Sequence, residues 1–144
     1  MKTISKLFVV IFMLLGNRSL AQEIQSRQMI FTSESITIES TLVDCNDIKN
    51  GTAKQYQSLE VKNLTASSIQ VRFKKQLWYG GKCTSCQSDS EEYVTSVRLE
   101  PNGSLKGDCE SNDKQLKVFV RMLNLKDVSQ LTHFELVDVE ITEL

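Results

Sequence analysis

The chain has 144 residues, a formal net charge of −1 and four cysteines. This length is enough for one domain with its own hydrophobic core. The slightly acidic charge balance argues against nucleic acids and anionic membrane surfaces as partners, because both require a basic face that displaces counterions.

The N-terminal residues have the organisation of a secretory signal peptide. Lys2 and Lys6 precede nine consecutive apolar residues at 7–15, and the small residues Ser19 and Ala21 suit the −3 and −1 positions of a cleavage site. The apolar run is shorter than the about 20 residues that a membrane-spanning helix requires. The sequence therefore predicts a cleaved signal peptide at its N-terminus.

We divide the chain into this signal peptide, residues 1–21, and a single exported domain, residues 22–144, that is secreted or periplasmic. No second apolar stretch follows the first, so no membrane span is expected. Removal of the signal peptide takes away three basic residues and no acidic ones, which changes the formal charge from −1 to −4.

The exported domain has a hydrophobic periodicity of two along most of its length. In residues 69–79, for example, Ile69, Val71 and Phe73 alternate with polar residues, as expected of a half-buried antiparallel strand. Strands are predicted, in chain order, over 29–31, 36–44, 56–64, 69–79, 92–100, 104–108, 116–123 and 133–143.

The segments between these strands carry turn signals and no long helix. Asn-Gly pairs occur at Asn50 and Asn102, and residues 124–131 are the best helical candidate, as one turn or a loop. Many short strands without helices predict an all-β fold. We expect an antiparallel β-sandwich of six to eight strands, immunoglobulin-like in the broad sense.

Two strands have irregular patterns. Val118, Phe119 and Val120 are consecutive apolar residues, which favours a central strand covered on both faces. A phase slip at Leu136 and Val137 interrupts the alternation of the last strand and indicates a β-bulge.

The four cysteines, Cys45, Cys83, Cys86 and Cys109, predict two structural disulfides, because an even count in a small exported domain is typical of a disulfide framework. If every turn is a hairpin, all four lie at one end of the sandwich. A redox site at Cys83-Thr-Ser-Cys86 is disfavoured, because no helix pattern follows to lower a thiol pKa. A four-cysteine zinc site is disfavoured because only one close pair exists.

The pairing of these cysteines is not determined by the sequence. We favour Cys45–Cys83 with Cys86–Cys109, which would tie the 80–91 loop to two hairpins. The alternative is Cys45–Cys109 with a local Cys83–Cys86 ring.

Catalytic and cofactor motifs are scarce. His133 is the only histidine, and its pattern is that of an ordinary strand residue. No nucleophile elbow, phosphate loop or histidine pair is present, so no cofactor, metal or catalytic residue is predicted. The acidic loops at 88–92 and 108–113 lack the spacing of an EF-hand. Sequons for N-glycans begin at Asn50, Asn63 and Asn102 and coincide with turn chemistry.

The one candidate binding patch is aromatic. Tyr and Trp often anchor protein contacts when they are partly exposed, and Trp78 and Tyr79 are adjacent, with Tyr56 as a further candidate member. The alternative is that Trp78 covers the core at the cysteine end.

The segment from Cys45 to Cys109, with "LWYGGKCTSC" and "NGSLKGDC", and the signal end "LAQ" resemble small secreted proteins of Bacteroidetes-type bacteria. The resemblance implies a periplasmic or outer-surface location and carries no known activity. We predict a secreted, disulfide-stabilised, non-enzymatic binding or structural module with a protein or glycan partner. The alternatives are a thiol-disulfide oxidoreductase acting through Cys83 and Cys86, or an inhibitor or effector that presents the 80–91 loop.

Overall fold

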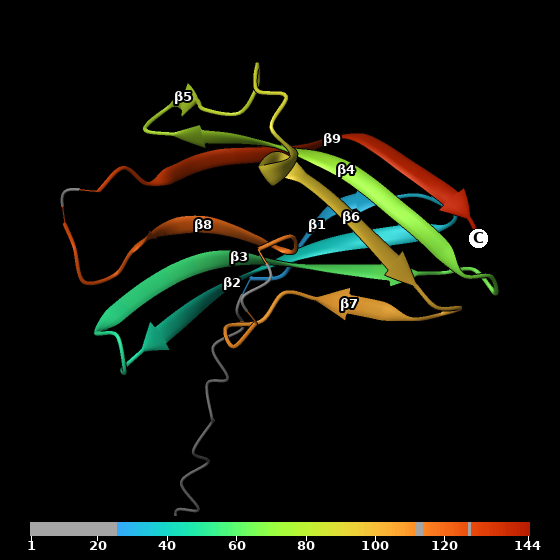
Figure 1. Cartoon of the computed structure of the whole chain (residues 1–144), viewed down its shortest axis with the longest axis horizontal. Helices are drawn as coiled ribbons and strands as arrows, with labels where there is room; N and C mark the ends of the chain where they lie inside the picture. Colours follow the sequence, from blue (N-terminus) through green and yellow to red (C-terminus); the bar gives the residue numbers. More distant parts are fainter. Residues whose placement is uncertain (1–25, 112–113, 127) are drawn as a thin grey trace, which may run out of the picture.

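The computed structural model describes residues 26–111, 114–126 and 128–144, so the predicted signal peptide and its cleavage site lie outside the described residues. The described chain forms two antiparallel β-sheets that face each other (Figure 1). Its strands are β1 (Gln28–Thr32), β2 (Ile36–Asp47), β3 (Thr52–Asn63), β4 (Ile69–Tyr79), β5 (Lys82–Cys83), β6 (Val94–Leu99), β7 (Ser104–Lys106), β8 (Lys117–Met122) and β9 (Leu131–Glu143).

The predicted β-sandwich is confirmed. Sheet A has the order β1-β2-β3-β7, with β8 also paired to β3, and sheet B has the order β5-β4-β6, with β9 also paired to β4. Nine strands are described against the six to eight expected, and two of them, β5 and β7, have only two and three residues. Within the described ranges, the one helical element is a short 3-10 turn, Glu91–Tyr93. No helix in the described ranges is long and apolar enough to cross a membrane.

The core lies between the sheets and follows from the alternation of the strands. Ile36 and Ile38 of β2 and Leu59 and Val61 of β3 face sheet B and are fully buried. Phe73 of β4 is their largest fully buried partner. Burial of such side chains contributes about 1.5–3 kcal/mol each, so this apolar interface is what holds the two sheets together.

The connections decide which strands share a sheet. Residues 64–68 carry the chain from β3 in sheet A to β4 in sheet B, and residues 100–103 carry it back from β6 to β7. Both β2 and β4 nevertheless run towards the same end of the sandwich, at the left of Figure 1. We call this end the disulfide end.

Strand β8 lies at an edge and not in the centre of a sheet. Its only ladder within the described chain is with β3, which corrects the expectation drawn from its run of apolar residues. The apolar run has another cause, because β8, at this edge of sheet A, also contacts sheet B at the disulfide end. Val118 enters the core and is 2% exposed, whereas Phe119 contacts aromatic residues of both sheets.

The β-bulge in the last strand is confirmed. The register of β4 with β9 shifts between Arg72, which faces Glu140, and Lys74, which faces Val137. Asp138 lies within this shift and has a φ of 53°, a left-handed conformation that is uncommon for a residue other than glycine. A bulge in an edge strand also hinders pairing with a second chain.

Two glycine positions have a backbone requirement. Gly80 and Gly81 connect β4 to β5 with φ values of 56° and 80°, the conformation of a two-residue hairpin turn with both central residues left-handed. At Gly107, an added Cβ would lie 2.2 Å from the carbonyl oxygen of Leu116. Only glycine therefore lets the backbone that follows β7 pass this close to the backbone that precedes β8.

One of the three sequon asparagines is part of the interior. Asn63 is 2% exposed, and its amide donates to the carbonyl oxygens of Ser67 at 2.7 Å and Glu100 at 2.9 Å. An N-linked glycan would replace a hydrogen that these bonds use, so a glycan at Asn63 does not fit this fold. Asn50 and Asn102 are exposed at turns.

Candidate functional site

Both disulfides are present, and their pairing corrects our preferred prediction. Cys45 is joined to Cys109, with Cα atoms 5.3 Å apart, and Cys83 is joined to Cys86, with Cα atoms 5.8 Å apart. This is the alternative pairing. All four cysteines are oxidised, so no thiolate is left for the four-cysteine zinc site. Two disulfides indicate an oxidising compartment.

The sandwich explains why Cys45 does not bond Cys83. Cys45 is in β2 of sheet A, opposite Lys54, whereas Cys83 is in β5 of sheet B, opposite Trp78. Facing sheets are about 10 Å apart, and a disulfide needs Cα atoms within about 7 Å. The cysteines share one end of the sandwich, as hairpin parity predicts, but they belong to different layers.

The segment closed by the Cys83–Cys86 disulfide supplies hydrogen-bond partners to β4 where its pairing with other strands is interrupted. On one side, β4 pairs with β6 through residues 69–74 and with β5 through residues 78–79. Residues 75–77, between these two parts, have no strand partner on this side among the described residues. The hydroxyl of Ser85 occupies this gap. It accepts the N–H of Leu77 at 2.8 Å and donates to the carbonyl oxygen of Lys75 at 3.0 Å. The N–H of Thr84 donates to the carbonyl of Leu77 at 2.8 Å.

This geometry gives the Cys-x-x-Cys segment a structural role. Ser85 is 0% exposed, and the ring on either side of it fixes the backbone from which its side chain reaches β4. Residues 87–90, which follow the ring, form no helix, so Cys83 and Cys86 lack the helix N-terminus that activates a redox thiol.

The predicted aromatic patch is divided between two faces. Successive strand residues point to opposite sides of a sheet, so Trp78 and Tyr79 cannot share a surface. Tyr79 points inward, and its hydroxyl donates to the carbonyl oxygen of Phe119 at 2.6 Å. The Phe119 ring lies 6.5 Å from the ring of Tyr79 and 5.8 Å from that of Tyr56. Phe119 therefore joins Tyr56 to Tyr79.

Trp78 belongs to the outer face of sheet B. It lies opposite His133 of β9, with ring centroids 4.9 Å apart, and Nε2 of His133 is 2.9 Å from a carboxylate oxygen of Glu135. Trp78 thus packs against a strand neighbour and is separated from Tyr56 by the thickness of the sandwich.

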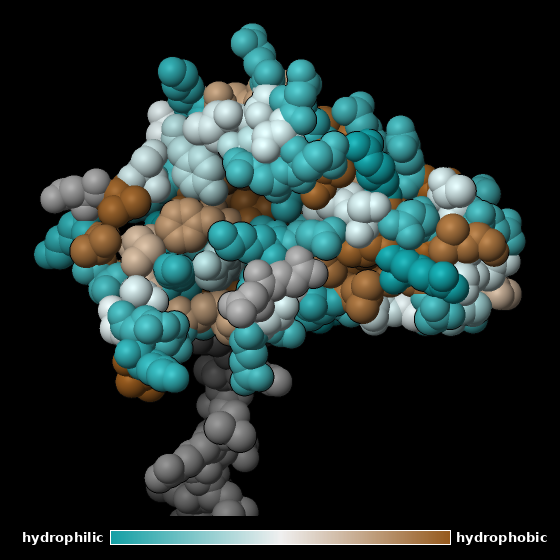
Figure 2. Space-filling view, viewed as in Figure 1, coloured by the Kyte–Doolittle hydropathy of each residue, from teal (hydrophilic) through white to brown (hydrophobic). Residues whose placement is uncertain are grey.

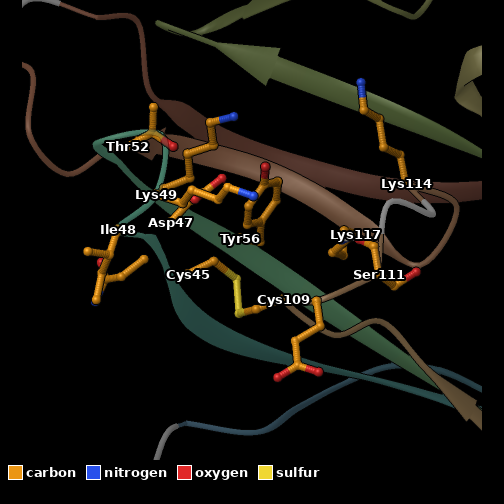
Figure 3. A pocket seen from close by; sticks show the side chains of 13 residues that line it. Cys45, Asp47, Ile48, Lys49, Thr52, Tyr56, Cys109, Ser111, Lys114 and Lys117 are labelled. Carbon is orange, nitrogen blue, oxygen red and sulfur yellow. Dashed lines mark hydrogen bonds between the residues drawn. A yellow bond between two sulfur atoms is a disulfide. The ribbon is translucent and has the colours of Figure 1, made fainter.

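A concave surface opens at the disulfide end beside Tyr56. It has a volume of about 650 Å³, and we call it the lysine cleft. In Figure 3, Tyr56 lies between Lys49 and Lys117, near the Cys45–Cys109 disulfide. A neighbouring space has a volume of about 380 Å³, and we call it the aromatic hollow. Four residues line both the cleft and the hollow, and two others line the hollow alone. The shared residues are Lys54, Tyr56, Lys114 and Lys117, and the added ones are Phe119 and Met122.

Among the described residues, three lysines of the cleft form no close ion pair, although the charge of Lys54 also acts on Asp47. Within the described chain, Lys49, Lys54 and Lys114 form no ion pair with a carboxylate. Of the two described acidic residues in the lining, Asp47 is occupied by its own turn. It accepts the side-chain amide of Asn50 at 2.6 Å and its backbone N–H at 3.1 Å, and these bonds lower the pKa of Asp47.

The outer face of sheet A shows the opposite arrangement. There Glu39 and Glu60 alternate with Arg27 and Lys62 in four ion pairs of 3.1–3.9 Å. Charges on this face compensate one another, whereas those of the lysine cleft are left for solvent or a ligand.

One wall of the cleft is anchored to sheet B. Lys75 of β4 is 4% exposed, and its ammonium donates to the carbonyl oxygens of Lys114 at 3.3 Å and Gln115 at 3.1 Å. The hydroxyl of Thr95 also donates to the Gln115 carbonyl, at 2.6 Å. These bonds fix the backbone of the segment that enters β8. At its end, Lys117 donates to the carbonyl of Ser111 and lies 5.6 Å from the centre of the Tyr56 ring.

Sequence reasoning identified Tyr56 and both cysteines of this site but not the lysines. Lys49 lies in the β2–β3 turn and Lys54 in β3, whereas Lys114 lies before β8 and Lys117 at its start. No local cluster in the sequence therefore marks them. The available signal was the register of β2 with β3, which places Lys54 opposite Cys45.

No protein-family model, curated protein or solved structure matches this chain. Among the described residues, no group of three or more histidine, cysteine or acidic side chains is arranged to hold a metal ion. The site is therefore interpreted from its own geometry.

The buried phenol of Tyr79 makes stability depend on pH in the alkaline range. Burial, with a smaller contribution from Tyr93, raises the pKa of Tyr79 from 10.0 to about 12. Between these values the unfolded chain loses the proton and the folded chain keeps it, so the free energy of unfolding falls as pH rises. We expect this fall to be smaller in Tyr79→Phe than in the wild type, measured by urea unfolding from pH 10 to about 12. Parallel curves would contradict the assignment.

Proposed function

We propose that this chain is the exported, disulfide-stabilised binding module of a non-enzymatic protein, with the lysine cleft as its binding site for an anionic ligand. The observation that carries the proposal is the set of three lysines, Lys49, Lys54 and Lys114, without described carboxylate partners around one concave surface. A formal charge of −4 for the predicted mature domain makes this local excess of basic groups notable.

The surroundings of the cleft support a binding role more than a catalytic one. Lysine ammonium groups donate hydrogen bonds to anions at short range, and the wall that carries Lys114 is held in place from sheet B before any ligand arrives. His133, the only histidine, lies with Trp78 on the outer face of sheet B, away from the cleft. A general base of the common imidazole type is thus not near the lysines.

The oxidoreductase alternative has less support. Cys83 and Cys86 flank a serine that completes the hydrogen bonding of β4, so opening of their ring would disturb the strand at each turnover. We expect the purified domain to show no turnover in insulin reduction, and the same result for the Cys83→Ser variant. Turnover by the wild type that is lost in Cys83→Ser would show that the protein is a thiol-disulfide oxidoreductase.

The binding proposal is tested by NMR titration of the exported protein with anionic oligomers, both peptides and carboxylated or sulfated oligosaccharides. We expect shifts of backbone signals confined to the lysine cleft, with at least one oligomer, and recovery of that oligomer unchanged by mass spectrometry. The triple variant Lys49→Gln, Lys54→Gln and Lys114→Gln should lose the response.

A matched variant controls for net charge. Lys82→Gln, Lys106→Gln and Arg98→Gln remove three charges from exposed positions outside the cleft and should leave the response intact. Absence of any cleft response, or equal loss in both triple variants, would refute the proposal.

A further inference from the structure

We propose that the lysine cleft and the aromatic hollow together bind an extended acidic peptide segment of a partner protein. Carboxylates of the segment would lie on the lysines, and an apolar side chain would enter the hollow between Tyr56, Phe119 and Met122. This inference rests on the proposed function of the cleft and adds the class of ligand.

The charge of the surface selects an acidic ligand. Four lysines contribute to the lining, while the described acidic side chains in it are Asp47 and Glu110. Lysine carries a compact charge on a flexible stem and does not impose the planar, two-pronged geometry of arginine. A series of carboxylates on a flexible chain suits such a surface better than one fixed anion.

The aromatic hollow adds an apolar requirement. Phe119 and Met122 line the hollow but not the lysine cleft. The ring of Phe119 packs against the rings of Tyr56 and Tyr79, which fix its position. Figure 2 shows hydrophobic residues at this end of the molecule among hydrophilic ones. Ile48, at the tip of the β2–β3 turn, is 93% exposed and forms part of the cleft rim.

The shape favours a chain over a compact ligand. The two spaces, of about 650 and 380 Å³, are joined through the four residues that they share. Pockets for single small molecules have about 300–1,000 Å³ and enclose most of the ligand. Here two such spaces adjoin along the residues that line both, so a longer ligand can extend from one space into the other.

The combination of both requirements favours a peptide over an acidic glycan. A peptide can place an aliphatic or aromatic side chain next to carboxylates, because consecutive residues of an extended chain project to alternate sides. A uronic or sulfated glycan supplies anions but no apolar side chain for the Phe119 and Met122 surface. An anionic glycan is therefore the competing outcome of the experiment.

The experiment measures fluorescence anisotropy of labelled oligomers with the exported protein. The probes are a peptide that alternates Glu and Leu, an all-Glu peptide of equal length, a neutral peptide that alternates Gln and Leu, and a sulfated oligosaccharide. We expect the Glu and Leu peptide to bind most tightly and the neutral peptide not to bind. Added salt should weaken the binding, since exposed charges are screened.

Two variants separate the contributions. The triple variant Lys49→Gln, Lys54→Gln and Lys114→Gln should weaken binding of the Glu and Leu peptide by about threefold to about 160-fold, because it removes three exposed ion pairs with the ligand. Met122→Ala should weaken the Glu and Leu peptide about threefold or more and leave the all-Glu peptide unchanged, because it removes apolar surface only. The triple variant Lys82→Gln, Lys106→Gln and Arg98→Gln serves as the control.

The outcomes distinguish this inference from the proposed function. Cleft-dependent binding of the oligosaccharide, with no peptide bound, would overturn the peptide inference and leave the cleft as an anion-binding site. Equal binding of the neutral and acidic peptides would also overturn it. If no anionic probe binds, both the peptide inference and the proposed function fail.

Discussion

Replacement of Cys45 and Cys109 by alanine is expected to lower the thermal midpoint of the 22–144 domain by about 15 °C. The disulfide joins residues 64 positions apart, so its loss restores a large loop-closure entropy to the unfolded chain, on the order of 4 kcal/mol in the chain-entropy model. A domain of this size loses about 4 °C per kcal/mol. The bond also fixes the start of the 109–117 segment against β2, so we expect the lysine cleft to lose its shape with it.

The Cys83→Ala and Cys86→Ala pair is the matched control for this prediction. Its cysteines are three positions apart, so little chain entropy depends on their bond, and we expect a clearly smaller fall of the midpoint. Differential scanning calorimetry of both double variants measures the contrast. Equal falls would contradict the entropic account.

The oxidation state can be checked directly on the wild-type protein. We expect no free thiol when the exported protein is denatured without reductant, and a midpoint that falls in reductant but is unchanged by a chelator. Four reactive thiols with bound zinc would show that the cysteines serve a metal. The Cys83–Cys86 bond closes a short loop, whereas both bonds of the preferred pairing would have closed longer ones.

Ser85→Ala is expected to destabilise the domain by about 2–4 kcal/mol, although it removes a single oxygen atom. The hydroxyl is buried and satisfies both the N–H of Leu77 and the carbonyl of Lys75. Without it, both backbone groups lose the hydrogen bond to Ser85, at about 1–3 kcal/mol for each buried group that is then unsatisfied. Urea unfolding, monitored by Trp78 fluorescence, measures the loss.

Ser88→Ala is the matched control in the same loop. Its hydroxyl accepts the N–H of Ser90 at 3.2 Å at an exposed position, where water can replace it, so we expect a change within about 0.5 kcal/mol. A Ser85→Ala variant as stable as the wild type would mean that the Cys83–Cys86 ring does not act as the missing partner of β4.

These expectations connect the stability of the fold to its candidate site. The Cys45–Cys109 bridge and the segment held by Lys75 form two walls of the lysine cleft. The same contacts that join sheet A to sheet B at this end therefore also pre-organise the lysines. Pre-organisation lowers the ordering cost of binding, which is how a small domain can present flexible lysines in a defined arrangement.

The sequence by itself determined the properties that depend on neighbouring residues. Alternation with a period of two gave the strands, as in 69–79, where Ile69, Val71 and Phe73 are all in the core. The Asn-Gly pairs at Asn50 and Asn102 marked turns between strands, and the phase slip at Leu136 and Val137 marked the bulge. Each of these signals is local, because strand alternation and turn conformations are set by a few consecutive residues.

Only the tertiary structure decided which residues meet across the sandwich. Hairpin parity placed the cysteines at one end, but the connection at 64–68 put Cys45 and Cys83 in different layers. The connection at 100–103 then returned the chain to sheet A before Cys109, and this selected the other pairing. The same layering separated Trp78 from Tyr56. It also brought Lys49 and Lys114 to one cleft from segments 65 residues apart in the sequence. Such contacts depend on sheet order, which no short stretch of sequence encodes because it is fixed by burial of the whole core.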